Sequence, residues 1–240
     1  QGPAQPPQGG RRPRRRRMRR SVMALFTVIV ILIVLVIADR VACAVTENEF
    51  ASQFKTQGFP VKPAVNIEGF PFLTQLAAKD FKKVDISASN IPAGPVTIST
   101  LHATITGLHI SGFSTSASAR VDHLTATAFI SFGALAAAGG LGGTGVTLTQ
   151  DGANKVKITA GIAGIASDTE VAQITQTGPQ TISIKLLDSG GGLGSLLGSF
   201  GSFSFSLPKG VPASLRITGL NLNSQGLTVS AAASNASFSQ

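Results

Sequence analysis

An unbroken apolar run near the N-terminus constrains this chain more than any other feature of its sequence. Across residues 22–38 only Thr27 is polar, and a helix of this length would span about 26 Å at ~1.5 Å per residue. With Ser21 and the stem of Arg20, that is enough to cross a hydrocarbon core of roughly 30 Å. β-Branched residues cover every side of such a helix and leave no polar stripe, which disfavours a buried helix of a soluble protein. We therefore predict a transmembrane anchor over residues 21–38.

The charge of the chain is concentrated before this run. Residues 1–20 hold eight Arg and no acidic residue, in a Pro-, Gln- and Gly-rich setting that predicts a disordered tail. Residues 41–240 hold eleven Lys and Arg against ten Asp and Glu, and the chain has neither Trp nor Tyr for base stacking. We expect no nucleic-acid partner. The positive-inside rule keeps the tail cytoplasmic and predicts a single pass through the plasma membrane, with the rest of the chain extracytoplasmic.

Two other interpretations of the apolar run stay open. Residues 42–44 read Ala-Cys-Ala and would suit signal-peptide cleavage after Ala44, although the run is longer than the usual core of roughly 7–15 residues. A lipoprotein signal ending at Cys43 is disfavoured because Arg40 occupies a position that wants an aliphatic residue. The single cysteine also excludes an intrachain disulfide and a Cys-based zinc cluster. A retained anchor remains our preferred interpretation.

The residues after the anchor, 45–240, predict one extracytoplasmic α+β domain with a mostly antiparallel, curved β-sheet. Apolar and polar residues alternate in several segments, as is typical of half-buried antiparallel strands. These segments are KKVDISASNI, PVTISTLHATITGLHI, GVTLTQDGANKVKITAGI, QTISIKLL and SLRITGLNLNSQGLTVSAAAS. QDGAN and NSQG supply the residues that tight turns need, so two β-hairpins are expected.

Three short helices are expected within the domain. Thr46 and Glu49 have the spacing of a capping box, which predicts the start of a separate amphipathic helix that ends at Gly58. A second helix is expected over residues 71–81, because proline suits its first turn. A short alanine-rich helix should begin at Ser131.

Residues 189–205 form a Gly-rich apolar segment that departs from the alternating pattern. The glycines argue against a stable helix, whereas the leucine and phenylalanine side chains are unfavourable in water. One interpretation is a flexible linker that leads into a Phe-rich strand. The other is an apolar lip that dips into a bilayer or covers a lipid pocket.

Motifs for catalysis are mostly missing. The glycine pattern at residues 140–145 resembles a dinucleotide site, but no helix is expected after it, so we interpret it as a loop. His102, His109 and His123 could join the abundant serines in a hydrolytic triad, but we prefer to interpret them as exposed strand or turn histidines. We assign no catalytic residue and expect no metal ion or cofactor.

One stretch resembles a known family. The string PAVNIEGFPFLTQLAAKDFKKVDISASNI places Gly-Phe-Pro-Phe-Leu at 69–73, then Gln75, a short helix and a strand at 84–86. Residues 128–137 and the closing segment from Leu207 agree with the same pattern. The chain is similar to the LmeA-like family of membrane-tethered phospholipid-binding proteins over roughly residues 20–235.

The resemblance implies a shape similar to tubular lipid-binding folds and binding of acidic phospholipid at the plasma membrane, with a role in envelope lipid or glycolipid maturation. It also implies an alternative, a phospholipase A-type hydrolase, and a non-enzymatic envelope scaffold is a second alternative. We predict that lipid contacts come from apolar residues of the motif and of the Gly-rich segment: Phe70, Phe72, Leu73, Leu76, Leu193, Leu196, Leu197 and Phe200.

Overall fold

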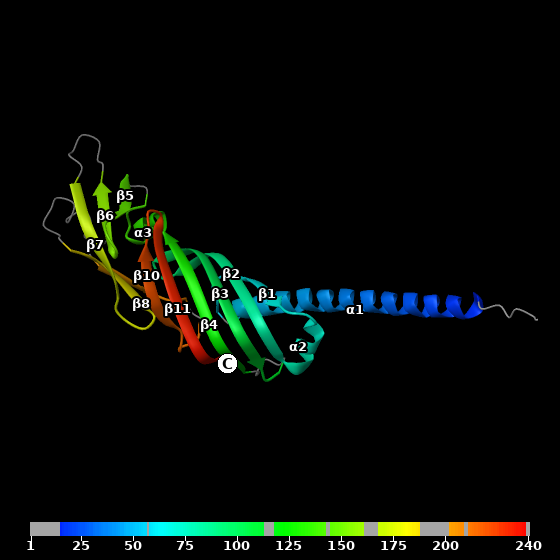
Figure 1. Ribbon diagram of the computed structural model, residues 1–240. Coiled ribbons are helices and arrows are strands. Elements are labelled where there is room, and N and C mark those ends of the chain that lie inside the picture. The colour runs from blue at the N-terminus through cyan, green and yellow to red at the C-terminus, as the bar shows by residue number, and fades with distance from the viewer. Residues whose placement is uncertain are drawn as a thin grey trace, which may run out of the picture.

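A computed structural model shows one long helix that projects from a β-rich domain (Figure 1). The structure describes residues 15–56, 58–112, 118–142, 145–160, 168–187, 202–208 and 211–238. The long helix is α1 (Arg15–Thr56), and within the described ranges it is the one helix long and apolar enough to cross a membrane. Helix α1 includes residues 15–20, which belong to the stretch predicted as a disordered tail. Residues 1–14 lie outside the described residues.

The predicted helix start at Thr46 is also wrong, because α1 continues through it to Thr56. Thr46 Oγ1 donates a hydrogen bond at 2.9 Å to the carbonyl of Ala42, one turn earlier in the same helix. A capping box needs a helix N-terminus with unpaired N–H groups. Here the preceding turn is already helical and supplies the hydrogen-bond partners, so the pattern marks no boundary.

The strands form two antiparallel sheets, which confirms the α+β class. The predicted strands are divided between these two sheets. The six-stranded sheet, called the large sheet below, has the order β1-β2-β3-β4-β11-β10. Its strands are β1 (Ala64–Glu68), β2 (Asp80–Ala93), β3 (Val96–Ile110), β4 (Ala119–Ser131), β10 (Arg216–Leu222) and β11 (Gly226–Phe238). The five-stranded sheet, called the small sheet, consists of β5 (Val146–Gln150), β6 (Lys155–Ala160), β7 (Asp168–Gln176), β8 (Thr181–Leu186) and β9 (Ser202–Ser206).

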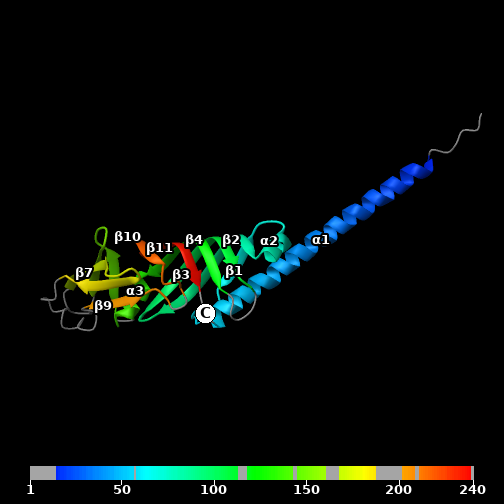
Figure 2. The ribbon, with the colours of Figure 1, turned by 90° about the horizontal axis from the view of Figure 1, so that it is seen from below.

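The short helices and hairpins largely follow the sequence. Helix α2 (Phe72–Ala78) lies within the predicted range, and α3 (Phe132–Ala138) begins after Ser131, whose Oγ accepts the N–H of Ala134 at 3.2 Å. The turns QDGAN and NSQG join β5 to β6 and β10 to β11, as predicted. Figure 1 and Figure 2 both show α2 beside α1 where the helix leaves the domain, with the small sheet at the far end.

The small sheet is inserted in the chain between β4 and β10, and it is bonded to the edge strand β10. The side-chain amides of Gln150, Gln176 and Gln180 each donate to a backbone carbonyl in β10 or in the residues just before it. The N–H of Ile217 donates to the carbonyl of Pro179 at 2.8 Å. Glutamine amides thereby satisfy carbonyls that an open sheet edge would leave unpaired.

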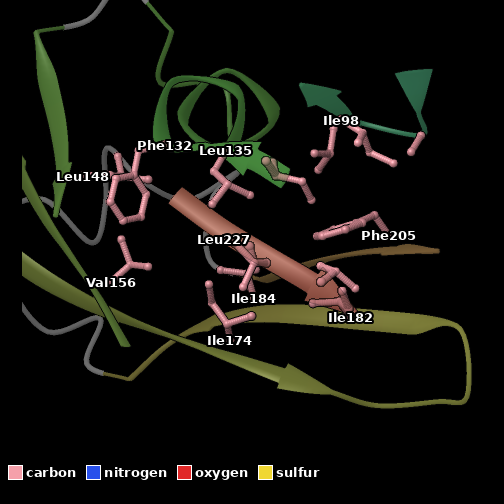
Figure 3. Packing of buried hydrophobic residues seen from close by; sticks show 14 of the residues in the cluster. Ile98, Phe132, Leu135, Leu148, Val156, Ile174, Ile182, Ile184, Phe205 and Leu227 are labelled. Carbon is pink, nitrogen blue, oxygen red and sulfur yellow. The ribbon is translucent and has the colours of Figure 1, made fainter. Parts of the chain in front are cut away.

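Two apolar clusters make up the core. In the cluster of Figure 3, Leu227 of the large sheet, Ile174 of the small sheet and Leu135 of α3 are all buried and belong to one packed group. The second cluster lies where α1 and α2 pack on the large sheet, and it includes the fully buried Phe72. Phe54, near the end of α1, packs against both clusters.

Candidate functional site

An apolar cavity of about 80 Å³ lies where the two core clusters meet. Its walls consist almost entirely of apolar atoms. They come from the C-terminal end of α1, the segment after it, four strands of the large sheet and residues 207–208 and 211–215. The lining residues are Phe54, Phe59, Pro63, Ile86, Ile98, Leu101, Ala103, Ile105, Leu124, Ala126, Ala128, Leu207, Pro208, Val211, Pro212, Leu215, Val229 and Ala231.

The cavity exists because a row of alanines crosses the middle of the large sheet. Ala103 of β3 pairs with Ala126 of β4, and Ala126 pairs in turn with Ala231 of β11. Residues paired across neighbouring strands point to the same face, so three methyl groups form one floor. In the adjacent row, Ile105 is paired with Leu124. The larger side chains beside the alanine row therefore form walls around a gap.

Residues 207–208 and 211–215, which we call the strap, cover the floor. Leu207 and Leu215 at its two ends both line the cavity. Gln180 of the small sheet holds each end: its carbonyl accepts the N–H of Leu207 at 3.0 Å, and its side-chain amide donates to the carbonyl of Leu215 at 2.9 Å. The same amide donates to the carbonyl of Pro212 at 3.0 Å. One glutamine thus fixes the roof of the cavity.

The size and chemistry of the cavity suit the end of a hydrocarbon chain. A cavity of about 150 Å³ takes up a benzene ring, so this space has room for about three carbon-sized groups. Water in a cavity needs polar partners, and these walls offer almost none. Occupation by an apolar chain is therefore favoured over occupation by water or a polar ligand. A longer chain would reach out of the cavity or push the strap outward.

The four predicted site residues that the structure describes lie outside this cavity. Phe72 is fully buried and Leu76 is half-buried, and both pack in the core cluster beside α1. Phe70 and Leu73 are exposed at the point where α1 leaves the domain. None of these four residues lines the cavity. The remaining candidates, Leu193, Leu196, Leu197 and Phe200, lie outside the described residues.

Within the motif that carries the family resemblance, Gly69 and Gln75 have structural roles. Gly69 has a φ of 112°, and a Cβ on it would lie 2.6 Å from the Gln75 side-chain nitrogen, so only glycine fits. The buried Gln75 accepts the N–H of Lys82 at 3.0 Å and donates to the carbonyl of Glu68 at 3.3 Å. It thereby ties the end of β1 to the start of β2.

The three histidines also lie away from the cavity. His109 lies between Asp80 and Asp122, with nitrogen–oxygen distances of 3.4 and 3.5 Å, and all three side chains are about half exposed. His123 Nδ1 is 3.3 Å from Ser234 Oγ in an exposed pair. No histidine is among the lining residues. In the described ranges, no group of three or more His, Cys, Asp or Glu residues could hold a metal ion.

The sequence contained no direct signal for the alanine floor. Alanine at Ala103, Ala126 and Ala231 is unremarkable in each strand alone, and the three meet only through the pairing of β3, β4 and β11. The small sheet separates β4 from β11 in the chain, so local periodicity does not predict which residues become partners.

Comparison with known proteins gives a family match. A family model described as LmeA-like phospholipid-binding matches residues 37–232. No curated protein and no solved structure matches the chain. The matched range begins at the end of the predicted span and contains every residue that lines the cavity.

Proposed function

The chain belongs to the LmeA-like phospholipid-binding family, and from that premise we propose that it binds an acidic phospholipid by taking the end of an acyl chain into the apolar cavity. The observation that carries this proposal is the cavity itself, which has a floor of alanines and walls that are almost entirely apolar. Its walls favour the transfer of hydrocarbon from water, at roughly 0.8 kcal/mol per buried methylene. Binding of this kind would serve maturation of an envelope lipid or glycolipid.

We further propose that residues 21–38 are a retained anchor and that the domain lies on the extracytoplasmic side of the plasma membrane. The apolar part of α1 is exposed throughout its described length, as expected of a lipid-facing helix. The eight arginines of residues 1–20 support an orientation in which the N-terminus stays in the cytoplasm.

Two alternatives differ in what they require of the cavity. A phospholipase A-type hydrolase needs a nucleophile and a base next to the bound lipid, and the described histidines supply neither at the cavity. An envelope scaffold needs no ligand, so its cavity would stay empty. The presence of bound lipid therefore separates the proposal from the scaffold, and release of fatty acid would separate it from the hydrolase.

A substitution that fills the cavity with a larger side chain tests the proposal. In Ala231→Leu, the three added carbons should fill most of this space and leave little room for an acyl chain. The full chain is extracted in mild detergent, and co-purified phospholipid is measured by mass spectrometry. We expect wild type to carry phospholipid and Ala231→Leu to carry several-fold less, with an unchanged far-UV circular dichroism spectrum.

The matched control is Ala232→Leu. Ala232 follows in the same strand and points to the opposite face, so leucine there adds the same bulk outside the cavity. It should retain wild-type lipid. Equal lipid in Ala231→Leu and Ala232→Leu would refute the cavity as the binding site.

Rebinding to vesicles of phosphatidylglycerol and of phosphatidylcholine then tests the preference for acidic headgroups.

A further inference from the structure

Two exposed apolar side chains lie where α1 leaves the domain. Phe70 is 63% exposed and Leu73 is 39% exposed, and outside α1 the only other exposed large apolar residue in the described ranges is Leu187. The Arg40 guanidinium lies over the Phe70 ring, 5.3 Å from its centre. The backbone N–H of Leu73 donates to Asp39 Oδ1 at 2.8 Å. The Phe70 ring and the Leu73 backbone are thus held against the turn of α1 that directly follows the predicted span.

A row of polar contacts makes this joint rigid. Asp39, Cys43 and Glu47 are spaced by four residues and lie on one face of α1. Asp39 binds the start of α2, Cys43 Sγ lies 3.7 Å from the carbonyl of Ile67, and Glu47 Oε1 accepts the Ile67 N–H at 2.7 Å. Because α1 is unbroken from the span into this face, its insertion in the bilayer also sets the position of α2.

The helix rise places Phe70 and Leu73 at the depth of lipid headgroups. Arg40 is two residues beyond Ala38, the last residue of the span, which is about 3 Å along the helix axis. The headgroup zone is about 5–8 Å thick on each side of the hydrocarbon core. Val41 and Val45 of α1 are exposed just beyond this level and extend its apolar surface. With the span ending at Ala38, we expect the groups that contact Asp39 and Arg40 to lie within the headgroup zone.

We propose that Phe70, Leu73 and Arg40 form a membrane-contact patch that lies in the headgroup zone of the leaflet from which α1 emerges. The Arg40 side chain is half exposed, and its positive charge suits lipid phosphates at that depth. Phe70 and Leu73 bury apolar surface among the upper parts of the acyl chains. The patch holds the domain at one orientation to the bilayer, and the cavity therefore at one distance from its lipid source.

Tryptophan fluorescence tests this directly, because the chain contains no tryptophan. The full-length variants Phe70→Trp and Leu73→Trp are reconstituted into vesicles of phosphatidylcholine and phosphatidylglycerol, with and without bromine on the upper part of the acyl chains. Leu187→Trp is the matched control, since Leu187 is 48% exposed and directly follows β8 in the small sheet, which Figure 1 shows at the opposite end of the domain from the point where α1 leaves it. Far-UV circular dichroism confirms that each variant is folded.

The expected result is quenching by brominated lipid that is several-fold stronger for Phe70→Trp and Leu73→Trp than for Leu187→Trp. Equal, weak quenching at all three positions would overturn the proposal. So would a blue shift of Phe70→Trp that grows with protein density and is insensitive to bromine, because it would show that a second copy covers the patch. The result is independent of lipid in the cavity, since neither residue lines it.

Discussion

Phe70 and Phe72 stand two residues apart in the motif and differ completely in burial. Phe72 has no exposed surface, and its ring centre lies 6.2 Å from that of the fully buried Phe81. Phe70 projects from the domain under the Arg40 side chain. Hydrophobicity alone predicted that both contact lipid, and nothing in the local sequence distinguishes a core anchor from a surface residue.

This difference predicts that the same substitution changes the free energy of unfolding by very different amounts at the two positions. Phe72→Ala leaves a void in the core cluster beside α1 and should lower the free energy of unfolding by about 3–5 kcal/mol. Phe70→Ala removes an exposed ring and should change it by no more than about 0.5 kcal/mol. Denaturant titrations of the full chain in detergent, followed by far-UV circular dichroism, measure both. Similar losses for the two variants would contradict the burial seen in the structure.

At the scale of elements, the joint between α1 and α2 depends on one carboxylate. Burial raises the pKa of Asp39, but the backbone N–H groups of Leu73 and Phe72 and the Arg40 guanidinium lower it more. The pKa therefore lies below its ordinary value of 3.8. The charged form is the one that binds α2, so it stabilises the folded state at neutral pH.

The joint should weaken in acid and in Asp39→Asn. A lowered folded-state pKa contributes stability above the unfolded value of 3.8, and this stability is lost as the pH falls through the folded-state value. We expect Asp39→Asn to have a lower thermal midpoint than wild type at pH 7, with the gap closing in acid below pH 3.8. Glu49→Gln, at an exposed position of α1, is the control and should match wild type. A gap that is constant with pH would contradict the role of the Asp39 charge.

Elements with strong local signals were predictable from the sequence. The alternation of β2 and β3, the turn residues of both hairpins and the alanine-rich helix expected from Ser131 were all identified correctly. The continuous helix through Thr46 was missed because its stabilising contacts are distant in sequence, as in the bond from Ile67 to Glu47. The same limit applies to the cavity, whose floor depends on register between strands that are remote in the chain.

For the whole molecule, the two sheets and α1 enclose an apolar interior that is larger than the cavity alone. A second, smaller cavity of about 10 Å³ shares Ile98, Ala128, Leu207 and Val229 with the first and reaches the small sheet at Phe205. The apolar interior is therefore continuous from the end of α1 to the small sheet.

The central claim is that an acyl chain occupies the space above the alanine floor, and photo-crosslinking tests it most directly. A phospholipid with a diazirine at the end of one acyl chain is bound to the full-length protein. The complex is irradiated, and the modified peptides are mapped by mass spectrometry. The account predicts adducts on β3, β4, β11 or the strap that disappear in Ala231→Leu and persist in Ala232→Leu. Adducts confined to residues 21–38 and to Phe70 and Leu73 would contradict it, because the lipid would then only surround the anchor.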